Sequence, residues 1–136
     1  MGIVWVYLIS LAGFLVLDAV ALTQLIRPHF ETHVGGLLRE NILYGAAVAF
    51  YLLYIAGILY FATLPGLAAQ DLRQTIVSAL VLGFMAYGTY EFTNMTTIEG
   101  WRWSMVLIDT AWGMTLTASV AALGYAGGRW LGVGAG

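Results

Sequence analysis

Four long apolar runs constrain this chain more than any other feature of its sequence. They cover residues 3–26, 42–64, 74–92 and 105–127, and a helix needs about 20 apolar residues to cross the hydrocarbon core of a bilayer. Backbone polar groups in lipid must be hydrogen-bonded within the chain, which leaves helices or a closed β-barrel. Runs this long and continuously apolar exclude a barrel. We therefore expect an all-α integral membrane protein.

The connections between the runs predict how the helices are arranged. They are short, about 10–15 residues, so consecutive helices should lie as antiparallel neighbours. The first run has no basic segment before it and no cleavage site after it, so we expect it to be retained as a span. Residues typical of helix ends lie in the connections: Pro28, Asn41, Pro65, Asp71 and Gly100. The sequence predicts one domain over residues 1–136, an up-down-up-down bundle of four transmembrane helices.

Composition agrees with a lipid-facing surface and excludes some partners. Only 9% of the residues are charged, against about 25% in soluble domains. A net charge of −2 without a basic cluster argues against nucleic acid, because phosphate binding needs clustered Lys or Arg. The absence of cysteine excludes thiolate metal sites. Positive charges divide evenly, with three arginines on the loop side against two arginines and the free amino group on the side of the termini, so the orientation in the membrane is open.

Aromatic residues mark both expected membrane interfaces, where their amphipathic rings are favoured. On the side of the two termini they are Trp5, Tyr60, Phe61 and Trp130. On the opposite side, that of the connections after the first and third runs, they are Phe30, Tyr44, Trp101 and Trp103. We call the bilayer halves next to these two sides the terminal-side half and the loop-side half.

Polar residues within the spans concentrate in the loop-side half. Asp18 lies about two-thirds along the first run, Glu91 and Asn94 end the third, and Asp109 lies near the start of the fourth. Helical spacing puts Tyr87, Glu91 and Asn94 on one face. The fourth helix has a stripe at four-residue intervals that consists of Asp109, Gly113, Thr117 and Ala121. Its small residues let another helix approach closely. We predict a polar pocket lined by Asp18, Tyr44, Tyr51, Tyr87, Glu91, Asn94, Asp109 and Trp112.

Each of these residues also has a purely structural interpretation. Glu91 at the end of a span is equally compatible with the headgroup layer, and Asp109 with stabilising the start of the fourth helix. Asp18 is harder to explain in this way, because a carboxylate well inside a span costs at least ~2.5 kcal/mol on insertion scales. Pairing with a neighbouring helix is the structural alternative for Asp18. For the tyrosines it is packing.

The fragment HFETH presents a metal-site alternative. His29 and His33 are four residues apart, the spacing of two histidine ligands on a helical turn. The two glycines that follow favour a solvated loop instead, and no third ligand is indicated by spacing. We therefore predict no metal site, and His29 and His33 remain the candidates if there is one. No Gly-rich phosphate loop, nucleophile elbow or dinucleotide fingerprint is present, so the sequence identifies no cofactor.

Four segments resemble a family of small bacterial inner-membrane proteins known only as a domain of unknown function. They are LDAVAL, AFYLLYIAGILYFATLPGLA, YGTYEFTNMTTIEGW and VLIDTAWGMTL. The family motif is Tyr-Asp-x-Thr-Asn, then Trp, then Val-Asp-x-Ala-Trp-Gly. It falls here on Tyr90, Glu91, Thr93, Asn94, Trp101, Asp109, Ala111, Trp112 and Gly113. The resemblance implies the fold and a multi-pass location in the bacterial cytoplasmic membrane, and it implies no activity.

This chain departs from the family pattern at two places. Glu91 stands where the family usually has Asp, and Ala21 or Leu22 where the first helix usually has Trp. The longer arm of Glu91 keeps the charge but disfavours a rigid metal site at this position.

Three function classes remain open. The first, which we favour, is a protein that binds or transports a small molecule, an ion or a lipid through the acidic pocket. The second is a membrane enzyme acting on a lipid or isoprenoid, with two acids in acid and base roles. No nucleophile–base pair supports it, so we lean against an enzyme. The third is an accessory subunit whose small-residue stripes pack against a second copy or a partner membrane protein.

Overall fold

The chain folds into four long helices. The computed structural model describes residues 1–37 and 43–134, and within these ranges it consists of helices and turns. The α-helices are α1 (Gly2–Ala21), α2 (Arg27–Val34), α3 (Tyr44–Ile58), α4 (Leu64–Ala69), α5 (Leu72–Thr97) and α6 (Trp103–Trp130), and a 3₁₀ helix covers Gly35–Leu37. Two π-helical segments, Leu22–Ile26 and Leu59–Thr63, join α1 to α2 and α3 to α4.

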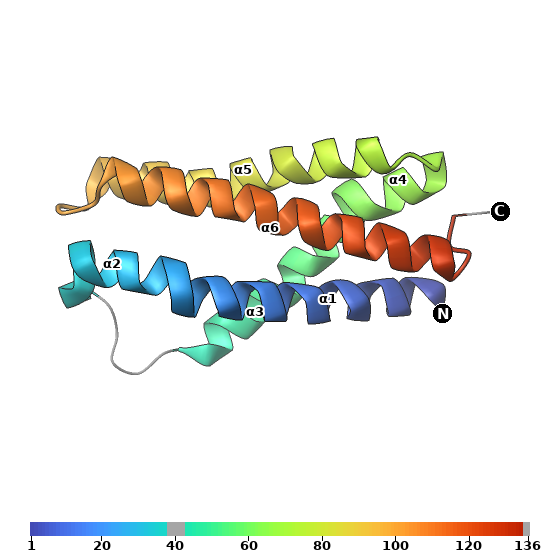
Figure 1. The fold of residues 1–136 in the computed structure, drawn as a ribbon, viewed down its shortest axis with the longest axis horizontal. Coiled ribbons are helices and arrows are strands. Elements are labelled where there is room, and N and C mark those ends of the chain that lie inside the picture. Colours follow the sequence, from blue (N-terminus) through green and yellow to red (C-terminus); the bar gives the residue numbers. More distant parts are fainter. Residues whose placement is uncertain (38–42, 135–136) are drawn as a thin grey trace.

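Each of the four resulting helices is long and apolar enough to cross a membrane. The spans are Gly2–Val34, Tyr44–Ala69, Leu72–Thr97 and Trp103–Trp130. The prediction of an all-α membrane protein with four spans is therefore confirmed. The chain reverses direction at each connection, so both termini lie at the same end (Figure 1). The α5–α6 pair has the most extensive contact, α1 packs against α6, and α3 crosses the bundle at an angle (Figure 1).

Two predicted helix ends are wrong, because both prolines are accommodated inside continuous helices. Proline lacks an N–H group, and its ring clashes with the carbonyl four residues earlier, so it breaks a regular α-helix. Pro28 and Pro65 each lie in the first turn of the helical segment that follows a π-helical segment. The wider π turn changes the hydrogen-bond register at that point. The HFETH fragment consequently lies in α2, not in a loop.

Two other predicted helix signals are confirmed. The Asp71 side chain accepts a hydrogen bond from the Gln74 backbone N–H at 3.3 Å and caps α5. Gly100 has a φ of 86° in the turn before α6, a backbone conformation that favours glycine. Asn41, expected to cap the second span, lies outside the described residues.

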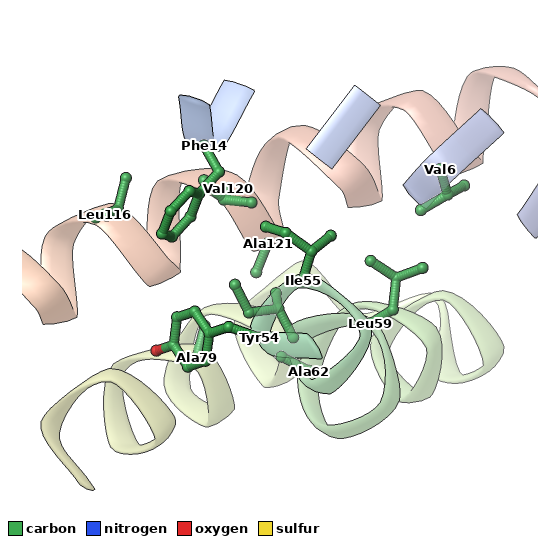
Figure 2. Packing of buried hydrophobic residues seen from close by; sticks show 11 residues of the cluster. Val6, Phe14, Tyr54, Ile55, Leu59, Ala62, Ala79, Leu116, Val120 and Ala121 are labelled. Atoms are coloured by element: carbon green, nitrogen blue, oxygen red, sulfur yellow. The ribbon is translucent and has the colours of Figure 1, made fainter. Parts of the chain in front are cut away.

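The main apolar core fills the terminal-side half and the middle of the bundle. Phe14 of α1 lies against Leu116 and Val120 of α6, and Tyr54 of α3 lies near Ala79 of α5 (Figure 2). Buried hydroxyls in this region bond to backbone carbonyls: Ser10 to Val6, Thr63 to Ala121 and Thr75 to Ala62. Backbone carbonyls of the same or a neighbouring helix therefore satisfy these hydroxyls, which offer no binding site.

A second apolar cluster lies at the loop-side end. It consists of Ile26, Phe30, Val34, Trp101, Met105 and Val106. Phe30 and Trp101 were expected as interface anchors, but both are buried, with ring centroids 5.3 Å apart in an edge-to-face arrangement. That expectation is wrong because α2 continues far enough past Pro28 to cover the turn that carries Trp101. The other six predicted anchors are exposed.

Glycines determine how closely α5 and α6 approach. A Cβ atom on Gly83 would lie 2.7 Å from the Gly113 carbonyl oxygen and 2.8 Å from the Met114 Cα. A Cβ on Gly113 would lie 2.1 Å from the Tyr87 ring. Gly113, Thr117 and Ala121 are all buried. The small-residue stripe predicted on the last helix is therefore a helix–helix contact within the chain.

We predict that Gly83→Ala destabilises the protein by about 1–3 kcal/mol, because the added methyl group meets backbone atoms that cannot rotate away. Gly57→Ala is the matched control, since a Cβ there meets nothing within 4 Å. It should be neutral or stabilise by up to about 1 kcal/mol through helix propensity. Unfolding in detergent micelles, followed by circular dichroism, measures both. Equal stability of the two variants would contradict this account of the α5–α6 contact.

Candidate functional site

A cavity of about 320 Å³ lies in the loop-side half, between the four long helices. Its lining residues are Asp18, Leu22, Ile26, Phe50, Tyr51, Ala86, Tyr87, Tyr90, Asp109 and Trp112. Tyr51 lies seven residues into α3 and Asp109 six residues into α6. At a rise of 1.5 Å per residue, both are about 10 Å from the loop-side ends of their helices. The cavity is therefore within the span.

Asp18 faces this cavity because it belongs to the buried stripe of α1. Val6, Ser10, Phe14 and Asp18 recur every four residues and are all buried. Asp18 is 6% exposed, and the Tyr51 hydroxyl donates a hydrogen bond to its Oδ2 at 2.7 Å. The contact joins α1 to α3 and satisfies one carboxylate oxygen.

Asp109 brings a second carboxyl group to the cavity from α6. It is 7% exposed and lies on the same stripe as Gly113. Helix α6 begins at Trp103, so Asp109 is nearly two turns inside it, and the interpretation of Asp109 as a helix-start residue is wrong. Trp112 lines the cavity from the next turn, and its buried Nε1 makes no hydrogen bond with the described residues.

Glu91 lies behind the cavity wall, not in its lining. It is 0% exposed, so the headgroup interpretation is wrong. Its Oε1 accepts a hydrogen bond from the Trp101 Nε1–H at 3.0 Å, and its Oε2 has no partner among the described residues. The carboxyl group interacts with that of Asp109, and a hydrogen bond between the two requires that one of them be protonated. The α5–α6 contact thus pairs two acids.

The structure places the predicted site residues in three groups. Five line the cavity: Asp18, Tyr51, Tyr87, Asp109 and Trp112. Glu91 adjoins it through Asp109. Tyr44, which is 69% exposed, and Asn94, near the end of α5, lie outside the lining. The spacing of Asn94 places it on the face of Tyr87 and Glu91, but both Asn94 and Tyr44 lie too near the ends of their helices to reach the cavity.

Sequence reasoning missed the remaining lining residues and the partner of Glu91. Phe50 and Tyr90 line the cavity beside Tyr51 and Tyr87. Tyr90 belongs to the family motif, and its membership in that motif could have identified it as a candidate site residue. Trp101 was assigned to the interface, and only its burial identifies it as a hydrogen-bond donor to Glu91. Leu22, Ile26 and Ala86 carry no sequence signal, because apolar residues are common throughout the spans.

Negative charge dominates the site. Two carboxyl groups line the cavity, a third adjoins it, and no basic residue of the described chain lines it. Within residues 1–37 and 43–134, the salt bridge found is the exposed Arg27–Glu31 pair of α2. Buried charges are costly unless they are paired or neutralised. The three acids therefore favour either protons or a cation.

The two histidines of α2 lie outside this site. Their rings are 4.7 Å apart, and His29 Nε2 lies 3.0 Å from the Ser104 hydroxyl oxygen. Their four-residue spacing places them on one face, as the helical alternative predicted. Among the described residues there is no group of three or more His, Cys, Asp or Glu side chains placed to hold a metal ion.

Three exposed residues that line the cavity mark its mouth, and one of them is Leu22 after α1, which is 39% exposed. Phe50 of α3 is 48% exposed and Tyr90 of α5 is 52% exposed, although both line the cavity. Both lie within spans, so this mouth faces the region that lipid occupies. The α1 and α6 contributions, Asp18 and Asp109, are buried at the inner end. The arrangement is an aromatic entrance leading to two acids.

Comparison with known proteins identifies the family. No curated protein and no solved structure matches the chain. Residues 3–126 match the model of a family described as "Predicted membrane protein (DUF2177)". This match covers most of the chain and includes all the residues of the cavity. The protein is therefore a member of the DUF2177 family of predicted membrane proteins.

Proposed function

We propose that this protein binds a small organic cation, an amine or quaternary ammonium compound, in the cavity of its loop-side half. The observation that carries the proposal is the composition of the cavity lining, which among the described residues contains two carboxyl groups, five aromatic rings and no basic side chain. The volume of about 320 Å³ is at the lower end of the range of small-molecule sites, about 300–1,000 Å³.

Aromatic rings and carboxylates together favour an organic cation over a hydrated metal ion. The cavity lining includes five aromatic residues, Phe50, Tyr51, Tyr87, Tyr90 and Trp112, and a cation–π contact is worth about 0.5–2 kcal/mol. Calcium and magnesium need about six or more oxygen ligands, or retained water. Leu22, Ile26 and Ala86 offer none. These apolar walls suit the carbon atoms of an alkylated amine.

The position of the mouth supports entry from the bilayer. An amphiphilic cation partitions into the membrane interface, and Phe50 and Tyr90 are exposed at that level of the bundle. Its charged group would then meet Asp109 and Asp18 at the inner end. Beyond the cavity, the buried hydroxyls of Ser10, Thr63 and Thr75 bond to backbone carbonyls. This packed core favours a binding site over a continuous pore.

Choline and benzyltrimethylammonium are suitable probes, with titration of the detergent-purified protein measured by calorimetry. We expect both to bind. The uncharged isostere of choline, in which carbon replaces nitrogen, should bind at least about tenfold more weakly, a difference of 1.4 kcal/mol. Asp18→Asn and Asp109→Asn should each weaken binding of the cations by a similar factor.

The control for the charge changes is Glu99→Gln, because Glu99 is exposed and outside the cavity. Its affinity for both cations should equal that of the unaltered protein. Circular dichroism should show unchanged helix content in all variants. Equal binding of choline and its uncharged isostere would refute a cation site, as would full affinity in Asp109→Asn.

The aromatic contribution can be tested at Tyr90, which is half exposed and so tolerates substitution. Tyr90→Phe keeps the ring and should bind benzyltrimethylammonium with nearly unchanged affinity. Tyr90→Leu keeps an apolar side chain but removes the ring, and should weaken binding about 2–30-fold, the equivalent of 0.5–2 kcal/mol. The same calorimetric titration measures both. If the leucine variant binds as well as the phenylalanine variant, Tyr90 makes no cation–π contact.

A further inference from the structure

The Glu91–Asp109 pair raises the question of what compensates the negative charge of two buried carboxyl groups. Glu91 is fully buried, and its Oε2 has no hydrogen-bond partner among the described residues. This carboxyl group faces Asp109, which is itself buried and lines the cavity. Two ionised carboxylates cannot donate hydrogen bonds to each other, and like charges this close repel. A single proton on the pair would remove both problems.

Every neighbouring element adds negative or neutral groups to this pair. Helix α1 contributes Asp18, which interacts electrostatically with Asp109. Helix α3 contributes the Tyr51 hydroxyl, already donated to Asp18. Helix α5 contributes the phenols of Tyr87 and Tyr90.

Basic side chains of α2 and of the turn before α6 contact other residues or lie on the surface, so they do not neutralise the Glu91–Asp109 pair. Arg27 of α2 pairs with Glu31, and His29 lies against Ser104. Arg102 is an exposed residue of the turn before α6. The salt bridges found within the described ranges include none to Asp18, Glu91 or Asp109. Within residues 1–37 and 43–134, no basic side chain compensates the charge of the pair, which leaves a proton or a cation in the cavity.

We infer that the Glu91–Asp109 pair holds one proton in the ligand-free protein and releases it when a cation binds beside Asp109. The inference rests on the proposed function and adds proton exchange to it. In the release step a carboxylic O–H bond breaks, its electron pair remains on oxygen, and the proton passes to water. The ammonium group then compensates the charge that the proton had compensated. Cation and proton are thus competing ligands of one acidic pair.

Infrared spectroscopy at neutral pH tests whether the ligand-free protein holds a protonated carboxylic acid. A protonated carboxylic acid has a carbonyl stretch separate from that of carboxylates and amides. We expect this band in the unaltered protein and in Glu99→Gln, and a clear loss of intensity in Glu91→Gln. The amide of glutamine can donate an N–H to Asp109 but has no ionisable proton at neutral pH. Absence of the band from the unaltered protein overturns the inference.

Proton release on binding is tested by titrating choline in two buffers with different ionisation enthalpies. We expect about one proton released per bound cation and an affinity that rises up to about tenfold per pH unit over the exchange range. Glu91→Gln should bind choline with little dependence on pH. Glu91→Asp retains a carboxyl group and should keep a pH dependence, which guards against a purely structural effect of the glutamine variant.

The outcomes separate the two proposals. Binding of choline without proton release, and with the same affinity at each pH, overturns the exchange and leaves the cation site intact. An unchanged pH dependence in Glu91→Gln also overturns it, because the proton would then come from elsewhere. Failure of both cations to bind overturns the proposed function, and with it the exchange.

Discussion

The close approach of α5 and α6 decides where the acids of this protein lie. Gly83 and Gly113 leave no room for a Cβ atom between the two backbones. Within a bilayer such small-residue contacts are a main source of helix association, because lipid is as apolar as the side chains that it replaces. The same contact brings Glu91 and Asp109 to facing positions one to two turns from the loop-side ends. The acidic pair is therefore a consequence of backbone packing.

The rest of the bundle separates an apolar half from a polar one. The terminal-side half and the middle contain Phe14, Leu116 and Val120, with buried hydroxyls bonded to carbonyls. In the loop-side half, α3 contributes Phe50 and Tyr51 to a cavity that also contains Asp18 and Asp109. Isolated ionised acids are too costly to bury. Aromatic walls, facing carboxyls and a lipid-facing mouth together suggest a site where charge is exchanged and not permanently stored.

Much of the fold could be predicted from the sequence, because the bilayer imposes a simple length rule. Runs of about 20 apolar residues become spans, and short connections make neighbours antiparallel. The prediction failed at Pro28 and Pro65, where the first and second helices continue past a proline. The rule that proline ends a helix applies to a regular α-helix. The π-helical segments before these two prolines could not be predicted from the pattern of residues.

Sequence by itself determined the four spans and the concentration of acids in one half of the bilayer, since these depend on hydropathy and on position along each span. Only the tertiary structure decided which acids meet. Helical spacing gives the face of each residue but not the rotation or height of one helix against the next. Those depend on the contact at Gly83 and Gly113. That contact places Glu91 beside Asp109 and outside the cavity lining. The burial of Trp101, whose Nε1–H donates to Glu91, depends instead on its contact with Phe30 of α2.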